Sequence, residues 1–353
     1  MELMIYQFMW TTVTGDMLEQ SVPVIWHGEH LRRNGWDNPI TLCFLQGLDL
    51  LSDGYRSRLV ELGYEIVDCS PLVADIIKEY PLCLQLSTTS RYWFLRWNVL
   101  HALTMECAAE TIVHLDGDVI LLVDPSELYR DVAGKNFMLQ GCPVLTVISD
   151  RAWFTVWQGE FARLLADRKA YVATALEEKN NPHFPDRDYC NVCAYGPNRF
   201  EDQDMLEYLV AAGRLPQDRT FEVYDSAFYW IQNPLLPGEW HEEQAKGVLK
   251  QVVERDGNIY IGAKRLAFYH FQGDFAKYCR MWQQFTRFGI GDGASLLKLA
   301  GPGRRNSSLV DAAGKLIDLV NRKVSRLAVY QFAFQRNLAT GNLNITDIVN
   351  SCW

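Results

Sequence analysis

Two aspartates separated by one glycine, Asp116-Gly117-Asp118, stand between two apolar stretches, residues 111–115 and 119–123. β-Branched and apolar residues in such short runs are typical of buried strands. In extended backbone, side chains at i and i+2 point the same way, and the glycine between them leaves room for a ligand. Neighbouring unpaired carboxylates repel each other and resist desolvation. The pattern predicts a divalent cation, Mg²⁺ or Mn²⁺, bridging a diphosphate, although a solvated loop with two acids would use the same residues.

Three other stretches carry side chains that could complete such a site. Arg96 lies among aromatic residues in a predicted helix, where a guanidinium suits a phosphate or a base plane, or pairs structurally with an acid. Residues 200–206 place three acids and an amide before an apolar helix. They either cap this helix or serve a polyol as hydrogen-bond partner, base or nucleophile. His270 ends an aromatic strand, either as a core residue or as an imidazole ligand that favours Mn²⁺.

The apolar patterns around these residues predict an α/β sheet. Strands are expected at residues 3–10, 40–45, 64–67, 111–115, 136–139, 144–148 and 266–273, and helices at 17–31, 52–62, 87–103, 154–176 and 205–212. Alternating strands and helices in the first part of the chain indicate a parallel sheet covered on both faces. Ligands bind such sheets beyond the carboxyl ends of the strands, where the Asp-Gly-Asp sequence lies.

Composition narrows the class of protein. With 353 residues, 48% of them hydrophobic and 22% charged, the chain has ample material for a globular core. A net charge of −9 argues against nucleic-acid binding. Nine cysteines without framework spacing, Cys190 and Cys193 among them, favour reduced thiols in a cytoplasmic protein. No apolar run reaches the roughly 18 residues of a membrane span, and the first residues lack the basic region of a signal peptide.

Taken in order, the aspartate pair, the Asp-Gln-Asp sequence and the late His-Phe-x-Gly resemble motifs of the retaining glycosyltransferases of the GT-A fold. The resemblance is strongest to the group that contains glycogenin and the bacterial lipooligosaccharide galactosyltransferases, and it covers residues 3–280. It implies a GT-A fold, with a mixed, mainly parallel sheet and helices on both faces. It also implies a hexosyltransferase that moves sugar, with retention, from a nucleotide-sugar to a glycan or lipid-linked glycan acceptor.

The resemblance also implies roles for individual residues. Asp116, Asp118 and His270 would bind the metal, Mn²⁺ or Mg²⁺, that holds the donor diphosphate, with a UDP-sugar as the expected donor. Asp202 and Gln203 would lie near the anomeric carbon and the acceptor. Further donor contacts would come from Thr11, Thr12, Arg96, Gly117 and Lys277.

The chain departs from the family pattern in two places. The family usually has His-x-x-Gly-x-x-Lys-Pro-Trp, whereas Lys277 comes one residue later here and Pro-Trp is absent. Asn191 stands where the family often has Asn-Ala-Gly, but Ala-Gly is missing. These departures bear more on the stereochemistry of transfer than on donor binding.

Two other functions share parts of this pattern. A sugar-nucleotide pyrophosphorylase would need a glycine-rich phosphate loop after the first strand, and residues 10–16 contain a single glycine. A non-catalytic nucleotide- or carbohydrate-binding module would keep the fold without turnover. The presence of Asp116, Asp118 and His270 argues against that second alternative.

The C-terminal part has a different character, which predicts a catalytic domain at residues 1–280 and a helical extension at 281–353. Residues 301–341 carry seven basic and two acidic side chains, with apolar residues at helical spacing. Such a helix either packs on the catalytic domain or another subunit, or it binds an anionic membrane that carries a lipid-linked acceptor. We therefore expect residues 304–340 to mediate dimerisation or peripheral contact with the inner face of the membrane.

Overall fold

The computed structural model describes residues 3–12, 18, 22, 24–33, 35–36, 39–105, 109–122, 124, 127, 134–138, 143–185, 200–216, 228–231, 252–255, 258–261 and 264–270. All of them belong to one compact unit, Met1–Leu299. The predicted domain boundary at residue 280, the basic helix at 304–340, Lys277 and the pair Cys190 and Cys193 lie outside the described residues. These features therefore stay predictions.

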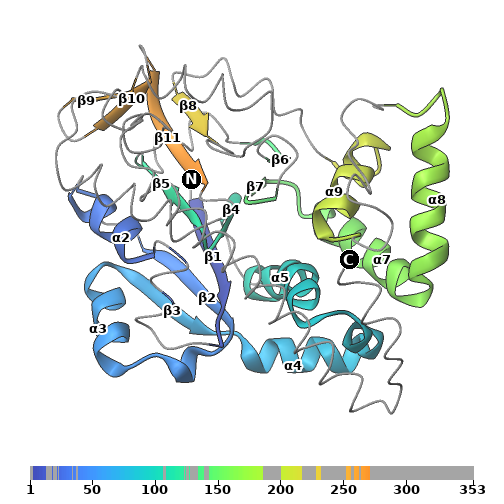
Figure 1. Ribbon diagram of the computed structural model, residues 1–353, viewed down its shortest axis with the longest axis horizontal. Coiled ribbons are helices and arrows are strands. Elements are labelled where there is room, and N and C mark those ends of the chain that lie inside the picture. Colours follow the sequence, from blue (N-terminus) through green and yellow to red (C-terminus); the bar gives the residue numbers. More distant parts are fainter. Residues whose placement is uncertain are drawn as a thin grey trace, which may run out of the picture. The chain divides into compact units, whose positions relative to one another are not determined.

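The first sheet carries the strands predicted around the aspartate pair. Its order is β3 (Tyr64–Asp68), β2 (Ile40–Gln46), β1 (Leu3–Trp10), β4 (Thr111–Asp116), β7 (Leu145–Ile148) and β6 (Phe137–Met138). The strands from β3 to β4 are parallel, whereas β7 runs antiparallel to both β4 and β6. This mixed, mainly parallel sheet, with helices on both faces (Figure 1), confirms the fold class predicted from the sequence.

A second sheet begins directly after the aspartates. Its order is β5 (Val119–Leu121), β11 (Lys264–His270), β10 (Asn258–Ile261) and β9 (Val252–Arg255), and β8 (Phe228–Ile231) pairs with β11. Only Gly117 and Asp118 separate β4 from β5. The chain therefore passes from one sheet to the other at the Asp-Gly-Asp turn.

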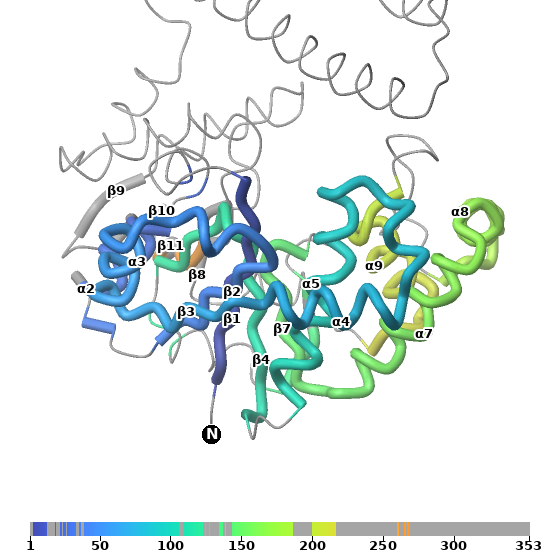
Figure 2. Tube along the Cα trace, turned by 90° about the horizontal axis from the view of Figure 1, so that it is seen from below, coloured from blue at the N-terminus to red at the C-terminus, as the bar shows by residue number. Residues whose placement is uncertain are grey.

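Helices cover both faces of the first sheet, as the perpendicular view shows (Figure 2). Helices α2 (Val24–Arg33) and α3 (Asp53–Glu61) lie on one face, and α4 (Ser70–Glu79) and α5 (Thr88–Thr104) on the other. Short 3₁₀ turns, Leu48–Leu50 and Pro81–Gln85, precede α3 and α5. Strand β1 serves both cores because its side chains alternate, with Ile5 and Met9 facing the α2 core and Tyr6 and Phe8 facing the α5 core.

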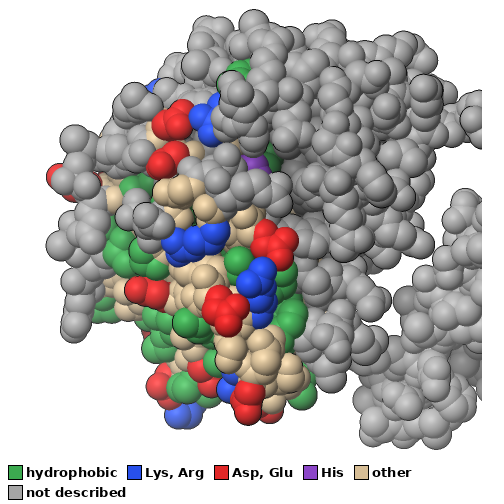
Figure 3. Space-filling view, turned by 90° about the vertical axis from the view of Figure 1, so that its left-hand side faces the viewer, with side chains coloured by type: hydrophobic (Ala, Val, Ile, Leu, Met, Phe, Trp, Pro, Cys, Tyr) green, Lys and Arg blue, Asp and Glu red, His purple; other side chains and the backbone are tan. Residues whose placement is uncertain are grey.

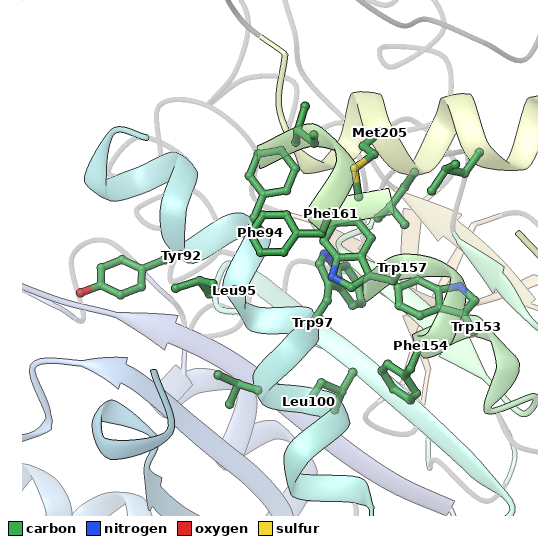
Figure 4. Close-up of a cluster of buried hydrophobic side chains, with 14 of the residues drawn as sticks. Tyr92, Phe94, Leu95, Trp97, Leu100, Trp153, Phe154, Trp157, Phe161 and Met205 are labelled. Carbon is green, nitrogen blue, oxygen red and sulfur yellow. The ribbon is translucent and has the colours of Figure 1, made fainter. Parts of the chain in front are cut away.

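The core on the α5 side is built largely from aromatic rings (Figure 4). Trp97 of α5 is fully buried, with ring centroids 5.1 Å from Trp153 and 5.9 Å from Trp157. Both of these tryptophans come from α7 (Ala152–Ala166), and Met205 of α9 (Asp202–Ala211) lies in the same cluster. Large buried rings contribute much of the packing energy of a core. The cluster thus fixes α5 and α9 against each other.

Several helices and strands differ from the sequence prediction. The helix described within the predicted span 17–31 is α2, which begins at Val24 after Pro23, and strands β8, β9 and β10 are not predicted. The helix predicted at 154–176 is two helices, α7 and α8 (Arg168–Asn180), because the Asp167 side chain accepts a hydrogen bond from the Ala170 backbone N–H at 2.9 Å and starts a new helix. The sequence interpretation also passed over α4, an amphipathic helix with Pro71 in its first turn.

The exposed face in Figure 3 carries acidic and basic side chains interspersed among apolar ones, with no concentration of one sign over its coloured part. Within the described residues, no helix combines the length and apolar character needed to cross a membrane.

Candidate functional site

The Asp-Gly-Asp turn lies at the carboxyl end of β4, where Asp116 pairs with Phe8 of β1. Gly117 is buried between the two partly exposed aspartates. A Cβ at this glycine would lie 3.2 Å from the Phe8 carbonyl oxygen and 3.4 Å from both Met9 Cβ and Val22 Cγ1. A side chain at this position would crowd the backbone of β1. Glycine lets the turn lie close to β1 and the two carboxylates flank that contact.

One arginine connects this turn to a distant part of the chain. Arg96 donates hydrogen bonds to Asp116 Oδ1 and to Asp202 Oδ2, the latter at 2.7 Å. The side chains of Arg96 and Asp202 are 3% and 4% exposed, and that of Asp116 is 21% exposed. Trp97 Nε1 donates to the same Asp202 oxygen at 3.0 Å, and the Arg96 guanidinium carbon lies 5.0 Å from the Trp97 ring centroid. We call these four residues the arginine network.

His114 borders the arginine network from β4. Its ring centroid lies 5.4 Å from Phe8 and 4.4 Å from Trp97. The Pro143 carbonyl oxygen lies 3.0 Å from Nδ1, which must therefore donate, so that Nε2 is the unprotonated nitrogen. Burial, and then the Arg96 charge, lower the pKa of His114 well below its ordinary value. Nε2 lies 3.6 Å from Asp116 Oδ1 and has no hydrogen-bond partner among the described residues. A neutral imidazole thus faces the aspartate.

The acidic residues at the start of α9 have different roles. Glu201 is the N-cap of this helix, and its backbone N–H donates to Asp204 Oδ2 at 2.9 Å, as in a capping box. Asp202 turns inward to Arg96, as described for the arginine network. Gln203 donates through Nε2 to the buried Glu207 at 2.9 Å. The capping explanation is therefore confirmed for Glu201 and Asp204, whereas a role of Asp202 or Gln203 toward a polyol stays a prediction.

A second group of polar and aromatic side chains lies at the ends of β1 and β2. Tyr92 donates a hydrogen bond to Gln46 Oε1 and its ring centroid lies 5.6 Å from that of Trp10. Tyr92 also points away from the aromatic cluster (Figure 4). Thr11 donates its backbone N–H to the Gln46 carbonyl at 3.1 Å, and Thr12 beside it is exposed. Aromatic faces beside an amide suit a flat polar ligand such as a nucleobase.

Backbone register brings His270 close to the turn. His270 pairs with Val119, the residue after Asp118, in the antiparallel ladder of β11 and β5. The side chain of His270 and the whole of Lys277 lie outside the described residues. The structure thus brings Asp116, Asp118 and Asp202 to one region and places the backbone of His270 beside it.

The donor set at the turn fits a hard divalent cation. Two carboxylates stand on either side of a buried glycine that packs against β1, and an imidazole-bearing residue follows on the neighbouring strand. Carboxylates with one imidazole suit Mn²⁺. Among the described side chains no group of three or more histidines, cysteines and acids is close enough to hold a metal. The two aspartates would therefore depend on His270, or on the ligand itself, to complete the coordination.

Sequence interpretation missed several residues of this region. His114, Gln46, Tyr92 and Trp97 are not among the residues that the sequence predicts for the site. A histidine inside the otherwise apolar strand Thr111–Asp116 is the signal that could have revealed the first of them. The other three depend on contacts between residues far apart in the chain. Gln46 and Tyr92, for example, are separated by 46 positions.

Comparison with known proteins gives a distant structural likeness. No family model matches the chain, and no curated protein matches it. Among solved structures, the crystal structure of mouse xyloside xylosyltransferase 1 in its apo form has 12% sequence identity and a TM-score of 0.38. The match covers 74% of this chain and 98% of that one. Similarity at this level does not identify a function, which has to be argued from the site.

Proposed function

We propose that this protein is a metal-dependent glycosyltransferase that transfers a sugar from a nucleotide-sugar, with a UDP-sugar as the favoured donor, to a glycan or lipid-linked glycan. The observation that carries the proposal is the arginine network. It joins Asp116, in the turn suited to a diphosphate-bound metal, to Asp202, which is expected to lie near the anomeric carbon of the sugar. A protein that only binds a nucleotide has no need to couple these two positions.

Different residues of the site would bind the base, the ribose and the diphosphate of such a donor. Trp10, Gln46 and Tyr92 would hold the base and Thr11 and Thr12 the ribose. All of them except Tyr92, which comes from α5, lie at the ends of the adjacent parallel strands β1 and β2. The Asp-Gly-Asp turn and His270 would hold the metal-bound diphosphate. A divalent cation bound here would act as a Lewis acid toward the leaving diphosphate.

Asp202 and Gln203 would act on the sugar and the acceptor. Asp202 Oδ2 already accepts two hydrogen bonds, from Arg96 and Trp97, so this carboxylate is better suited to fix charge near the anomeric carbon than to attack it. Gln203 is partly exposed beside it and is oriented by Glu207. Fixed dipoles would stabilise an oxocarbenium-like transition state, and fixed positions would supply proximity. Retention then follows most simply from attack on the same face of the sugar.

Nucleotide binding gives the first test, by thermal unfolding with UDP, GDP or CDP, each with and without Mn²⁺. A ligand at about 100 times its Kd stabilises a protein by about 2.7 kcal/mol. We expect stabilisation by one nucleotide, with Mn²⁺ only, that is lost in Asp118→Asn and kept in Asp75→Asn, an acid in an exposed ion pair on α4.

Turnover gives the second test, by metal-dependent release of UDP from a panel of UDP-hexoses. Binding without release would favour the non-catalytic module. If no nucleotide stabilises the protein with any metal, the proposed donor site is wrong.

A further inference from the structure

The backbone hydrogen-bonding groups along one edge of strand β5 bind side chains instead of a neighbouring strand. Among the described strands it pairs only with β11. Two backbone groups of β5 bind side chains: Gln7 Nε2 donates to the Val119 carbonyl oxygen at 3.1 Å, and the Leu121 N–H donates to His27 Nε2 at 3.1 Å. Gln7 comes from β1 and His27 from α2, and both are fully buried. These two side chains therefore replace a strand along the first residues after the Asp-Gly-Asp turn.

The protonation of His27 follows from its contacts. Because the Leu121 N–H donates to Nε2, this nitrogen is unprotonated and the ring proton lies on Nδ1. Nδ1 lies 3.3 Å from Gln7 Oε1 and donates to it. Burial, and then the neighbouring His30, lower the pKa of His27 to about 3, which keeps the ring neutral. His27 thus fixes the amide of Gln7 with its oxygen toward α2 and its NH₂ group toward the turn.

The oriented amide of Gln7 bridges the two ends of the Asp-Gly-Asp turn. Gln7 Nε2 donates to the Asp116 carbonyl oxygen at 3.0 Å as well as to that of Val119, so both hydrogens of its NH₂ group are used. These two carbonyls bracket Gly117 and Asp118. One amide therefore sets the distance between the end of β4 and the start of β5. We call Gln7, His27 and the backbone groups that they bind the amide network.

We infer that Gln7 and His27 are positioning residues that set the spacing of the Asp116 and Asp118 carboxylates for the metal-bound diphosphate. This inference rests on the proposed function, which makes the turn the donor site. Groups that orient metal ligands without touching the metal typically change metal affinity by about 10- to 100-fold when removed. Gln7→Glu keeps the shape of the side chain but has no NH₂ group. We expect it to weaken Mn²⁺-dependent UDP binding by about tenfold or more.

Two substitutions of His27 separate positioning from packing. Asparagine can place an NH₂ donor near the Nδ1 position and keep the contact with Gln7, but it loses the acceptor for Leu121. Glutamine can place its oxygen near the Nε2 position and keep the Leu121 contact, but it loses the donor to Gln7. Each variant removes one hydrogen bond, and asparagine leaves the larger cavity. A role in packing alone therefore makes His27→Asn the more damaging change, whereas positioning through Gln7 makes His27→Gln the more damaging one.

The experiment measures the Kd of UDP with Mn²⁺ by calorimetry, and hydrogen exchange of the amides of residues 116–121. Tyr64→Phe is the control because it removes another buried hydrogen bond to α2, from Tyr64 Oη to the Val24 carbonyl at 2.7 Å. We expect His27→Gln to weaken UDP–Mn²⁺ binding about tenfold and to speed exchange in the turn. His27→Asn and Tyr64→Phe should stay within about threefold of wild type, a difference below about 0.7 kcal/mol.

Equal effects of the two His27 variants, or a larger effect of His27→Asn, would overturn the inference. Failure of the wild-type protein to bind UDP with Mn²⁺ would instead count against the proposed function. In that case the exchange measurement still decides whether Gln7 and His27 hold the turn. Faster exchange at residues 116–121 in His27→Gln than in His27→Asn supports that role, and equal exchange overturns it.

Discussion

Two buried polar networks meet at the same turn from opposite faces of the sheet. The arginine network approaches on the α5 face and binds the side chain of Asp116, whereas the amide network approaches on the α2 face and binds its backbone carbonyl. The first contains one cation and two carboxylates, and the second is neutral throughout. The comparison indicates that the two networks have different roles at this turn. The arginine network compensates the charge of Asp116 from the α5 face, and the amide network holds the backbone conformation from the α2 face.

The two networks should differ in what they contribute to stability. Buried charges carry a large desolvation penalty, so removal of one partner leaves an uncompensated charge. Removal of a neutral donor leaves only unsatisfied carbonyls, at a smaller cost. Substitutions that interrupt each network in turn measure this difference.

The largest effect is expected from Arg96→Met, which leaves Asp116 and Asp202 without their cation. Loss of one partner of a buried ion pair costs about 3–5 kcal/mol, measured as the free energy of unfolding in urea. Arg91→Met on the same helix is the control, since Arg91 donates to backbone carbonyls at 3.3 Å. Its loss should cost about 1 kcal/mol. Equal losses for the two arginines would contradict the view that charge dominates the α5 face.

A smaller effect is expected from Gln7→Met, which keeps the side-chain volume and removes the donors to Asp116 and Val119. Unsatisfied buried carbonyls cost about 1–3 kcal/mol, again measured by urea unfolding. Gln158→Met is the matched control because the Gln158 amide, 2.9 Å from His101 Nδ1, is partly exposed. A cost for Gln7→Met as large as that for Arg96→Met would remove the distinction between the networks.

The amide network should also respond to acid. The pKa of His27 falls from 6.5 to about 3 on folding, so below pH 6.5 the unfolded chain takes up a proton that the folded protein does not. The stabilising effect of a neutral His27 is complete above pH 6.5 and is lost as the pH falls. Between pH 7 and 5.5 the loss is about 1 kcal/mol.

His27→Asn removes this dependence, so urea unfolding at the two pH values should show a shallower decline in the variant than in wild type. His101 and His114, whose pKa values are also lowered by burial, remain in both proteins and cancel in the comparison. Parallel declines would show that His27 is not held neutral in the fold.

The smallest effect is expected from an exposed ion pair. Arg58 lies 2.9 Å from Glu29 and 3.3 Å from Glu61, and all three side chains are more than 40% exposed. Exposed pairs of this kind contribute between about 0 and 1 kcal/mol. Arg58→Ala should therefore change the free energy of unfolding far less than Arg96→Met. A comparable loss would mean that burial is not the reason for the large contribution of the arginine network to stability.

The strands and the chemistry-bearing turn could be predicted from the sequence because their signals are local. The strand predicted at residues 3–10 is observed as Leu3–Trp10, and the prediction for 111–115 extends by one residue to Asp116. Apolar runs of this length, bounded by turns, encode a buried parallel strand directly. Arg96 was also identified, since an arginine among aromatic residues in a helix stands out without knowledge of the fold.

The connections between these elements could not be predicted. Arg96 and Asp202 are 106 positions apart, and Gln7 and Val119 are 112 apart, so no sequence window contains either contact. Gln7 is a single amide in an apolar strand, a pattern that a bulge or an edge strand would also produce. Only the pairing of β1 with β4 places its side chain under the turn.

Trp97 gives the arginine network an optical signal, the fluorescence of its indole ring. Its indole donates to Asp202 and lies under the Arg96 guanidinium, while Trp153 and Trp157 bury the rest of the ring. Indole emission depends on nearby charge, so a donor that displaces or polarises Arg96 should change the colour and yield of this one among the 11 tryptophans of the chain. The difference spectrum between wild type and Trp97→Phe then reports occupancy of the site without any label, in real time and at micromolar protein.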